Sequence, residues 1–259
     1  MSLKINLKTE IKKITDFIKS TLKREGFSKV VIGLSGGIDS TTSFYLLKKV
    51  LSPKNIIVAN LYYQENKDND LEKILKDAKI PKENIYRIGI KKIVDCFTES
   101  LHFEIPKQVR NDNKIRLGNI MARVRMIILF DLAKKHKALV CGTENKSEHY
   151  LGYFTRFGDA ASDFEPIRHL YKTQLLELAK YLEVPKNIIE KKPTANLWQG
   201  QTDEDEFGFT YKEADEVLYL YLEKKLKVNE IKKRAFKKTD KIIHWVIKNK
   251  FKHETPHAL

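Results

Sequence analysis

The sequence has few of the residues that hold secreted or metal-stapled proteins together. It contains two cysteines, Cys96 and Cys141, and no CxxC pair. This excludes a disulfide framework and a cysteine zinc site and fits a reduced cytoplasm. A long uncharged apolar run is also lacking, and residues 1–10 contain no apolar signal core, so neither a membrane span nor secretion is expected. Because no repeat and no Gly/Ser/Pro linker divides the chain, we expect one cytoplasmic domain over residues 1–259.

Acidic residues are scarce relative to basic ones. The chain has 34 Asp and Glu against 49 Lys and Arg, which gives a net charge of +15. Such a balance suits a polyanionic partner, and both nucleic acid and nucleotides qualify. Most of the lysines, however, fall at helical spacing on polar faces, where a solvated surface is the ordinary interpretation. The charge alone therefore selects no function.

Apolar runs alternate with amphipathic segments along much of the chain. Short β-branched runs predict buried strands, and apolar residues three and four apart predict helices. Strands are expected at 29–34, 55–61, 85–90 and 138–141, and helices at 3–25, 38–50, 71–78, 91–102, 119–136, 166–181, 211–226 and 228–250. This order predicts an α/β fold with a doubly wound, mostly parallel sheet, helices on both faces and a helical C-terminal part.

A polar loop joins the first strand to the next helix. Residues 33–42 read GLSGGIDSTT, in which Gly36 and Gly37 let the backbone turn tightly and approach a ligand. The helix start offers unpaired N–H groups to an anion, and serine hydroxyls such as that of Ser40 add donors. The Asp39 carboxylate would repel a phosphate unless a cation lay between them, which predicts a magnesium ligand. A plain turn with capping hydroxyls is the simpler alternative, but the combination favours phosphate binding.

A second polar segment, residues 142–163, follows the fourth strand. Thr143 would place a hydroxyl near a nucleotide, and Glu148 offers a carboxylate to complement Asp39. The alternative is a helix start with capping acids, and each acid taken alone is more simply a cap or a surface residue. Because the first and fourth strands carry the richest polar loops at their ends, we expect the two loops to share a site.

Other polar segments have less specific interpretations. A lysine at a helix start, such as Lys172, opposes the helix dipole, so a bound phosphate would account for it. Taken alone, an ordinary surface lysine is the simpler interpretation. Residues 191–209 are long, polar and glycine-containing, with Trp198 in the middle, and predict a mobile active-site flap. Residues 62–70 are a plausible lip of the site, and residues 104–114 are expected to be irregular.

Seven stretches, taken in order, resemble the ammonia-dependent NAD synthetases over nearly the whole chain. They are GLSGGIDS (33–40), GNIMARVRM (118–126), GTENKSE (142–148), GYFTRFGD (152–159), PIRHLYKTQ (166–174), PTANLW (193–198) and QTDEDEFG (201–208). The first resembles the SGGxDS loop of ATP pyrophosphatases and is not a Walker A loop. The resemblance implies an adenine nucleotide alpha hydrolase-like fold. It also implies a ligase that uses ATP and Mg²⁺ to amidate nicotinate adenine dinucleotide (deamido-NAD) with ammonia, through an NAD-adenylate, releasing AMP and pyrophosphate.

The resemblance also implies roles for individual residues. ATP would be held by Gly33, Leu34, Ser35, Gly36, Gly37, Ile38, Asp39, Ser40, Thr143, Lys172 and Thr194. Asp39 and Glu148 would bind magnesium, and the catalytic residues would be Lys172 and Asp159, the latter near the reacting carboxylate and able to receive a proton from ammonium. Deamido-NAD would contact Arg123, Arg156, Asp163 and Lys252. Two positions depart from the family: Arg156 replaces a usual lysine, and Phe251 replaces a histidine before Lys252.

The resemblance predicts partners as well. The dinucleotide site of the family lies between two subunits, and Val124–Ala133 is apolar nearly all round, so we expect a homodimer. Neither nucleic acid nor a membrane is expected as a partner. The synthetase motifs begin at Gly33, which leaves no room for an amidase domain, so free ammonia and not glutamine is the expected nitrogen donor.

Two rival functions stay open at this point. A tRNA-modifying adenylating enzyme of the same SGGxDS superfamily would explain the charge, but no appended RNA domain is evident. A non-catalytic nucleotide-binding module would explain the glycine loop but not two magnesium carboxylates and a flap.

Overall fold

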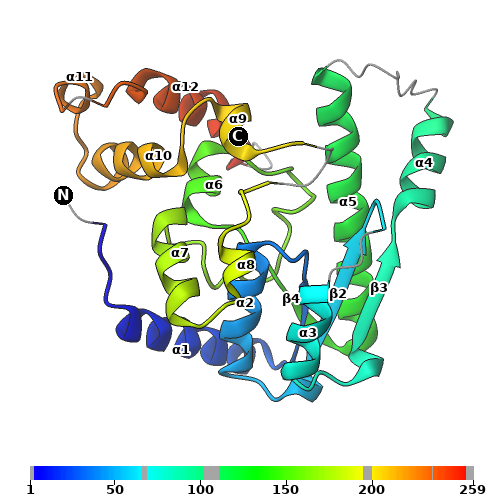
Figure 1. The fold of residues 1–259 in the computed structure, drawn as a ribbon. Helices are drawn as coiled ribbons and strands as arrows, with labels where there is room; N and C mark the ends of the chain where they lie inside the picture. The colour runs from blue at the N-terminus through cyan, green and yellow to red at the C-terminus, as the bar shows by residue number, and fades with distance from the viewer. Residues whose placement is uncertain (1–2, 66–68, 102–110, 195–199, 235, 255–259) are drawn as a thin grey trace.

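A parallel sheet of four strands forms the centre of the fold (Figure 1). The computed structural model describes residues 3–65, 69–101, 111–194, 200–234 and 236–254. The strands lie in the order β3-β2-β1-β4, with β1 at Lys29–Gly33, β2 at Ile56–Tyr62, β3 at Ile85–Gly89 and β4 at Ala138–Cys141. Every neighbouring pair is parallel. All four carboxyl ends therefore meet at one edge, as the sequence predicts.

Helices cover both faces of this sheet, which explains why β1, β2 and β4 are largely apolar without alternation. Val30 and Ile32 of β1 pack into the core on one face, and Val31 packs into the core on the other. The first face carries α1 (Leu7–Glu25), α2 (Ile38–Lys48), α3 (Asn69–Asp77), α7 (Lys172–Tyr181) and α8 (Lys186–Ile189); the second carries α4 (Lys91–Ser100) and α5 (Asn111–His136). The predicted doubly wound α/β class is confirmed.

The C-terminal part is helical and has its own apolar core, also as predicted. Its elements are α9 (Asp203–Phe207), α10 (Tyr211–Leu218), a π-helical turn (Tyr219–Glu223), α11 (Val228–Lys232) and α12 (Thr239–Asn249). Buried residues such as Phe207, Leu218 and Ile243 join Leu151 of α6 (Lys146–Leu151) in this core. Because α6 directly follows the loop after β4, the C-terminal helices pack next to the carboxyl edge of the sheet (Figure 1).

The starts of two helices differ from the prediction. The helix predicted from residue 3 begins at Leu7, because the Asn6 side chain accepts a hydrogen bond from the Thr9 N–H and caps it there. The helix predicted from residue 119 begins at Asn111, so part of the segment expected to be irregular is helical. Its first turns expose Ile115. The apolar stripe used to predict this helix therefore begins later than the helix itself.

Three further helices are shorter or more broken than predicted. The helix expected from Pro166 begins at Lys172, where Gln174 caps the Tyr171 N–H. The one expected over 211–226 changes to a π-helical turn after Leu218. The segment 228–250 forms two helices, because lysines and arginines four apart between them repel one another in helical geometry.

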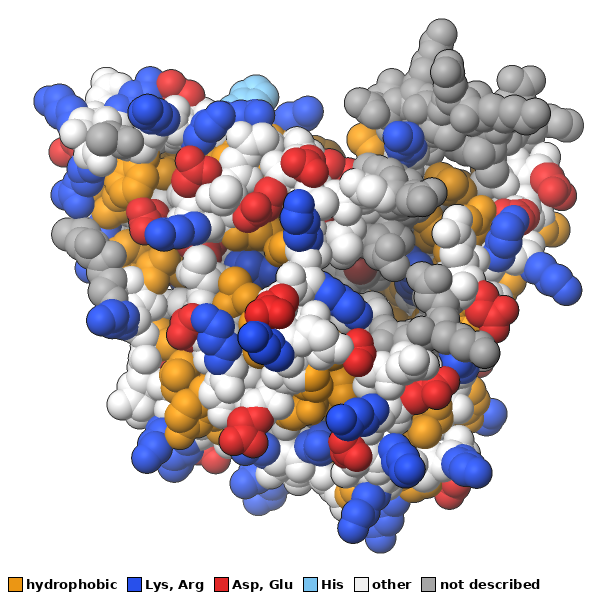
Figure 2. Space-filling model, in the orientation of Figure 1, with side chains coloured by type: hydrophobic (Ala, Val, Ile, Leu, Met, Phe, Trp, Pro, Cys, Tyr) orange, Lys and Arg blue, Asp and Glu red, His pale blue; other side chains and the backbone are white. Residues whose placement is uncertain are grey.

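The face of the molecule seen in Figure 2 has no continuous basic patch on its coloured part. Figure 2 shows Lys and Arg side chains spread across the coloured part of that face, with Asp and Glu among them. This arrangement is typical of solvated helix surfaces, as expected for most of the lysines. None of the helices in the described ranges is both long and apolar enough to cross a membrane.

Candidate active site at the carboxyl edge of the sheet

The loop between β1 and α2 is held open by its own hydroxyls. Gly36 has a φ of 78°, a left-handed conformation that favours glycine. The Ser35 Oγ accepts a hydrogen bond from the Gly37 N–H at 3.3 Å and lies 3.1 Å from the Ser40 Oγ. Ser40 also donates to the Gly37 carbonyl. Because no side chain caps the first turn of α2, its N–H groups stay available to an anion.

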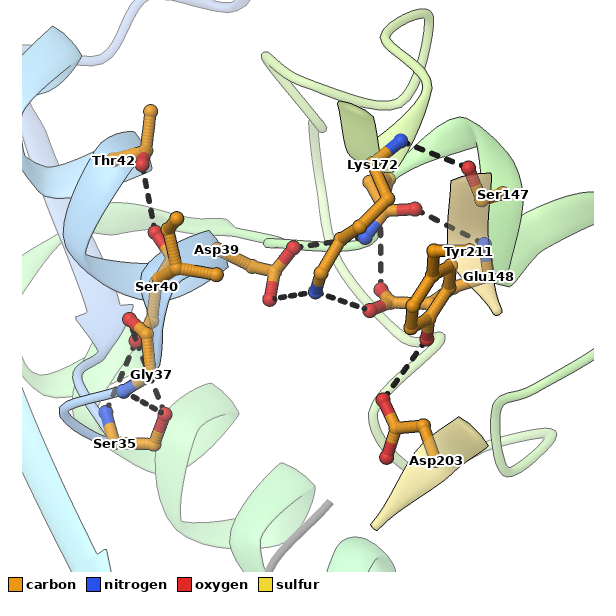
Figure 3. Close-up of polar contacts among 12 residues, drawn as sticks. Ser35, Gly37, Asp39, Ser40, Thr42, Ser147, Glu148, Lys172, Asp203 and Tyr211 are labelled. Atoms are coloured by element: carbon orange, nitrogen blue, oxygen red, sulfur yellow. Dashed lines mark hydrogen bonds and ion pairs between the residues drawn. The ribbon is translucent and has the colours of Figure 1, made fainter. Parts of the chain in front are cut away.

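Lys172 lies between the two carboxylates that the sequence assigns to magnesium (Figure 3). Its Nζ is 2.6 Å from the Asp39 Oδ2 and 3.1 Å from the Glu148 Oε1. The Asp39 Oδ1 also accepts a hydrogen bond from Asn145 at 2.8 Å. Residues from the starts of α2, α6 and α7 thus converge on one point, which brings the first and fourth strand loops together as expected.

The burial of this cluster changes its electrostatics. Burial raises the pKa of Glu148 to about 8, and the negative charge of Asp39 adds to this effect. Burial alone would lower the pKa of Lys172, but its two carboxylate partners raise it above the ordinary lysine value. The Lys172 side chain is only 2% exposed, so the simpler interpretation of it as a surface lysine is wrong. It is a buried cation fixed among acids.

Magnesium fits the chemistry of these donors. Asp39 and Glu148 present carboxylate oxygens, which Mg²⁺ prefers, from two rigid helix starts. In the described part of the chain, no group of three or more His, Cys, Asp and Glu side chains is placed to hold a metal. A magnesium ion held by these two carboxylates would therefore complete its coordination with phosphate oxygens and water.

Asp215 of α10 ties together the two helix starts that carry Glu148 and Lys172. It is fully buried and accepts hydrogen bonds from Ser147 of α6 and from the backbone and hydroxyl of Thr173 in α7. Ser147 in turn accepts from the Lys172 N–H at 2.8 Å (Figure 3). Burial raises the pKa of Asp215 to about 6. The acid acts on the cluster by positioning its helices.

Beside this cluster, a cavity of about 550 Å³ opens along the ends of β1, β2 and β4. Of the residues assigned to ATP, those that line it are Gly33, Leu34, Ser35, Ser40, Thr143 and Thr194. Asp159 and Lys252 line it as well. Asp39, Glu148 and Lys172 are not among its lining residues and form their cluster next to it.

Asp159 and Lys252 place opposite charges in the cavity wall. The Asp159 carboxylate accepts a hydrogen bond from the Thr155 N–H at 2.9 Å, and burial raises its pKa. Lys252 donates to the carbonyls of Gly152 and Phe154 at 2.6 and 3.0 Å, and burial lowers its pKa. These two carbonyls hold the Lys252 side chain in the cavity wall.

The remaining residues assigned to the dinucleotide lie elsewhere. Arg123 donates to the Arg156 carbonyl, and the Arg156 guanidinium lies 5.0 Å from the centre of the Phe251 ring. Asp163 accepts from the Val140 N–H at 2.7 Å, and its own N–H donates to the Val140 carbonyl. Arg123, Arg156 and Asp163 do not line the cavity of the single chain. Within a single chain, Asp163 instead pairs with the backbone of Val140 in the edge strand β4.

A pair of buried acids lies under the loop after β4. Glu144 and Glu165 have side chains 7% and 6% exposed, and both face the half-exposed Arg168, whose Nε is 3.6 and 3.4 Å from their carboxylates. Burial is the main cause that raises the pKa of each to about 7, against the pull of Arg168. The Glu144 Oε1 is buried and has no hydrogen-bond partner in the described structure.

Sequence reasoning missed several supporting residues. Asn145, Ser147 and Asp215 fix the cluster, and Arg125 lines the cavity. Asn145 could have been found, because an Asn three residues before a Glu is a capping-box signal, which the structure shows. Asp215 gave no such signal, because it lies in an ordinary amphipathic helix far along the chain. The central residues of the expected flap and lip, 195–199 and 66–68, lie outside the described residues.

The family model for NAD synthase matches residues 10–256. The chain belongs to this family. It is 42% identical over 259 residues to an NH₃-dependent NAD⁺ synthetase of Fusobacterium nucleatum, with 98% of this chain and 96% of the relative covered. It is also 44% identical over 231 residues to an NH₃-dependent NAD⁺ synthetase of Thermococcus kodakarensis, with 88% and 86% covered. The predicted family is therefore confirmed.

Solved structures support the NAD synthase fold. An NMN synthetase from Francisella tularensis superposes with a TM-score of 0.81 at 31% identity, covering 99% of each chain. An NH₃-dependent NAD synthetase from Campylobacter jejuni, solved in complex with the nitrate ion, gives a TM-score of 0.78 at 30% identity, covering 98% of this chain and all of that one. Both cover the sheet and the C-terminal helices, so the helical C-terminal part belongs to the family fold.

Proposed function

We propose that this protein is an NH₃-dependent NAD⁺ synthetase, a ligase that amidates deamido-NAD with ammonia at the expense of ATP. One observation carries the proposal: in a member of the NAD synthase family, a phosphate-type loop, a cluster in which the buried Lys172 pairs with Asp39 and Glu148, and a cavity meet at the carboxyl edge of the sheet. The curated relatives with 42–44% identity are NH₃-dependent NAD⁺ synthetases. The predicted ligase activity agrees with them.

In this proposal the triphosphate of ATP binds at the loop of residues 35–40. The available N–H groups of α2 and the Ser35 and Ser40 hydroxyls would hold the end that leaves as pyrophosphate. Lys172 adds a fixed positive charge at the same place, already oriented by its two carboxylates and by Tyr211, whose ring centre is 5.2 Å away. Thr143 and Thr194 line the cavity beyond.

Asp39 and Glu148 would hold Mg²⁺ at the edge of this nucleotide site. When bound, the ion supplies positive charge to the phosphates. The chain itself supplies the rest: it places the nicotinate carboxylate in line with the α-phosphate of ATP. An oxygen of the carboxylate bonds to that phosphorus as pyrophosphate departs, which leaves an acyl-adenylate in the cavity.

Ammonia then attacks the acyl carbon, AMP departs, and the new nitrogen must lose a proton. Asp159 lines the cavity and has a raised pKa, which makes it a suitable acceptor for this proton. Lys252, held by two carbonyls opposite, would contact the dinucleotide. Arg123, Arg156 and Asp163 lie outside the cavity of one chain, so we propose that they act on the dinucleotide at the surface of a homodimer in the cytoplasm.

The deciding experiment is release of pyrophosphate from ATP by the purified protein with each candidate acceptor. Release that requires deamido-NAD, with NAD formed from ammonium chloride, supports the proposal. Glutamine freed of ammonia should support no turnover, since the chain's only thiols are Cys96 in α4 and Cys141. Cys141 is buried at the end of β4, where burial raises its pKa and makes it a poor nucleophile. Release that requires tRNA instead would refute it.

A second acceptor is favoured by one comparison. The NMN synthetase of Francisella tularensis has the same fold over 99% of both chains, and amidation of nicotinate mononucleotide needs the same carboxylate chemistry with a smaller substrate. Comparing kcat/KM for nicotinate mononucleotide and deamido-NAD separates the two activities. A preference for the mononucleotide would make this chain an NMN synthetase.

A further inference from the structure

Arg125 of α5 is a cation in the wall of the cavity with most of its donors unused. Its Nε donates to the Leu61 carbonyl at the end of β2, at 3.0 Å. No other hydrogen bond or ion pair involves its guanidinium within the described residues. The side chain lines the same cavity as Ser35, Ser40 and Asp159. Its two Nη groups are thus free of protein partners where a ligand would lie.

Such an arrangement is costly unless something completes it. A guanidinium has five N–H donors, and a donor that leaves water without a new partner destabilises the folded state. Burial lowers the pKa of Arg125, and the Asp159 carboxylate is the main group that opposes this effect. Yet no ion pair joins Asp159 to Arg125 in the described structure. The cation and the acid both line the cavity without pairing directly.

We propose that Arg125 is an oxyanion subsite, at which its Nη groups bind a phosphate or carboxylate group of a substrate in the cavity. The planar fork of arginine matches two oxygens of such a group. The inference rests on the proposed function, which brings two anionic substrates, ATP and deamido-NAD, into this cavity. It assigns a role to a residue two positions from Arg123, the arginine for which the resemblance implies dinucleotide contact.

The positions of Arg125 and Asp159 in the cavity wall also separate the place of the oxyanion from that of the incoming nitrogen. An oxyanion at Arg125 would leave the Asp159 side of the cavity for the incoming nitrogen, so that the acyl group lies between a cation and a proton acceptor. The Nε bond to Leu61 fixes the guanidinium against β2 before any ligand arrives. Because the guanidinium is already fixed at its Nε, less of its freedom is lost when a ligand binds to the Nη groups.

The experiment measures ligand binding by three variants of the full-length protein. Arg125→Gln removes the charge and the fork, Arg125→Lys keeps the charge only, and Lys134→Gln removes a charge from an exposed position on the same helix. Equilibrium titrations use ATP in one arm and deamido-NAD in the other. We expect Arg125→Gln to weaken one of them roughly 10- to 100-fold. Arg125→Lys should recover only part of this loss, and Lys134→Gln should bind both normally.

The arm that weakens identifies the anionic group. Loss of ATP binding assigns Arg125 to a phosphate, and loss of deamido-NAD binding assigns it to the dinucleotide. Normal binding of both ligands by Arg125→Gln, with only a lower melting temperature, would show that Arg125 merely ties α5 to β2 and would overturn the proposal. If Arg125→Gln does not fold, Arg125→Lys decides the matter, because a phosphate or carboxylate subsite should still lose affinity with lysine.

Failure of the proposed function can be told apart from failure of this subsite. If the wild-type protein binds ATP but forms no NAD, the proposed function is refuted. The ATP titrations of the Arg125 variants would still test the subsite. If the wild type turns over and both Arg125 variants bind ATP and deamido-NAD normally, only the oxyanion subsite at Arg125 is refuted.

Discussion

The Asp39 and Glu148 carboxylates share one ammonium group, so neither can lose its charge without changing the other's surroundings. Asp39→Asn or Glu148→Gln keeps the shape of the side chain but removes a proposed magnesium ligand. We expect turnover to fall at least about 100-fold in each, since a preorganised charge at the reacting phosphates is lost. Steady-state kinetics with saturating magnesium checks this, with the exposed Glu83→Gln as the control.

Circular dichroism should report an intact fold in both variants, because Lys172 keeps one carboxylate partner. Near-normal turnover in either variant would remove that residue from the site.

Glu144 and Glu165 make stability depend on pH. Their pKa values are raised from 4.5 to about 7 in the folded state, so the folded protein holds protons more tightly than the unfolded chain between these values. Stability should therefore fall as pH rises from about 4.5 to about 7 and then level off. Glu165→Gln removes one of the two acids, so it should be more stable than wild type at pH 8 by about 1–3 kcal/mol and nearly equal at pH 4.5.

Urea unfolding at several pH values measures this difference, with the exposed Glu190→Gln as the matched control. Parallel pH profiles for wild type and Glu165→Gln would contradict the assignment.

Individual residues also show where sequence reasoning ends. The loop of residues 33–42 and Glu148 were predictable, because glycines, hydroxyls and acids after a strand have few other uses together. The burial of Lys172 was not, because its partners come from positions 133 and 24 residues away. Arg125 and Asp215 were missed for the same reason: what surrounds each of them comes from elements distant in the chain.

At the scale of elements, the site depends on the relative position of α6 and α7. Asp215 joins their first turns with both carboxylate oxygens. Asp215→Asn replaces one acceptor by a donor, so either the Ser147 hydroxyl or the Thr173 N–H loses its partner. We expect kcat to fall roughly 10-fold and the free energy of unfolding to drop by about 1–3 kcal/mol.

A purely structural role for Asp215 would lower stability but leave kcat unchanged at a temperature where the variant is folded. Stopped assays below the melting transition separate the two outcomes. Thr239→Val is the control, because it removes a buried hydroxyl at the start of α12 that bonds only to the Phe236 carbonyl in the described structure.

The order and type of the main elements followed from the sequence, while their ends often did not. Three apolar runs became the buried strands β1, β2 and β4, because a parallel sheet covered on both faces needs apolar residues at nearly every position. The fourth run became the edge strand β3, which is only partly buried. Helix ends depend on single caps and on local repulsion. Asn6 moved one start by four residues, and the basic run before α12 split a predicted helix into two.

At the scale of the whole molecule, α4 and α5 leave large apolar side chains exposed. Phe97 of α4 is 51% exposed and Ile127 of α5 is 61% exposed. Val124–Ala133 of α5 is apolar nearly all round, and in one chain only its sheet-facing side is covered. A second copy would cover this surface. We expect the double variant Phe97→Lys/Ile127→Lys to have half the molar mass of the wild type, that is, the 30.3 kDa of one chain.

Light scattering at micromolar concentration measures this, with Ile247→Lys of α12 as an exposed control expected to stay dimeric. A wild type that is monomeric and active at that concentration would refute the homodimer.

The pairing of Asp163 with Val140 has a consequence for solubility. A strand that ends a sheet offers unpaired N–H and C=O groups on which another chain can grow. Here one acid occupies both groups of Val140, and Phe164 forms a parallel bridge to Cys141 just beyond. Replacing Asp163 would therefore leave the Val140 N–H unpaired at this edge as well as remove a carboxylate. Loss of soluble protein, and not only of substrate affinity, is the outcome to expect when that position is changed.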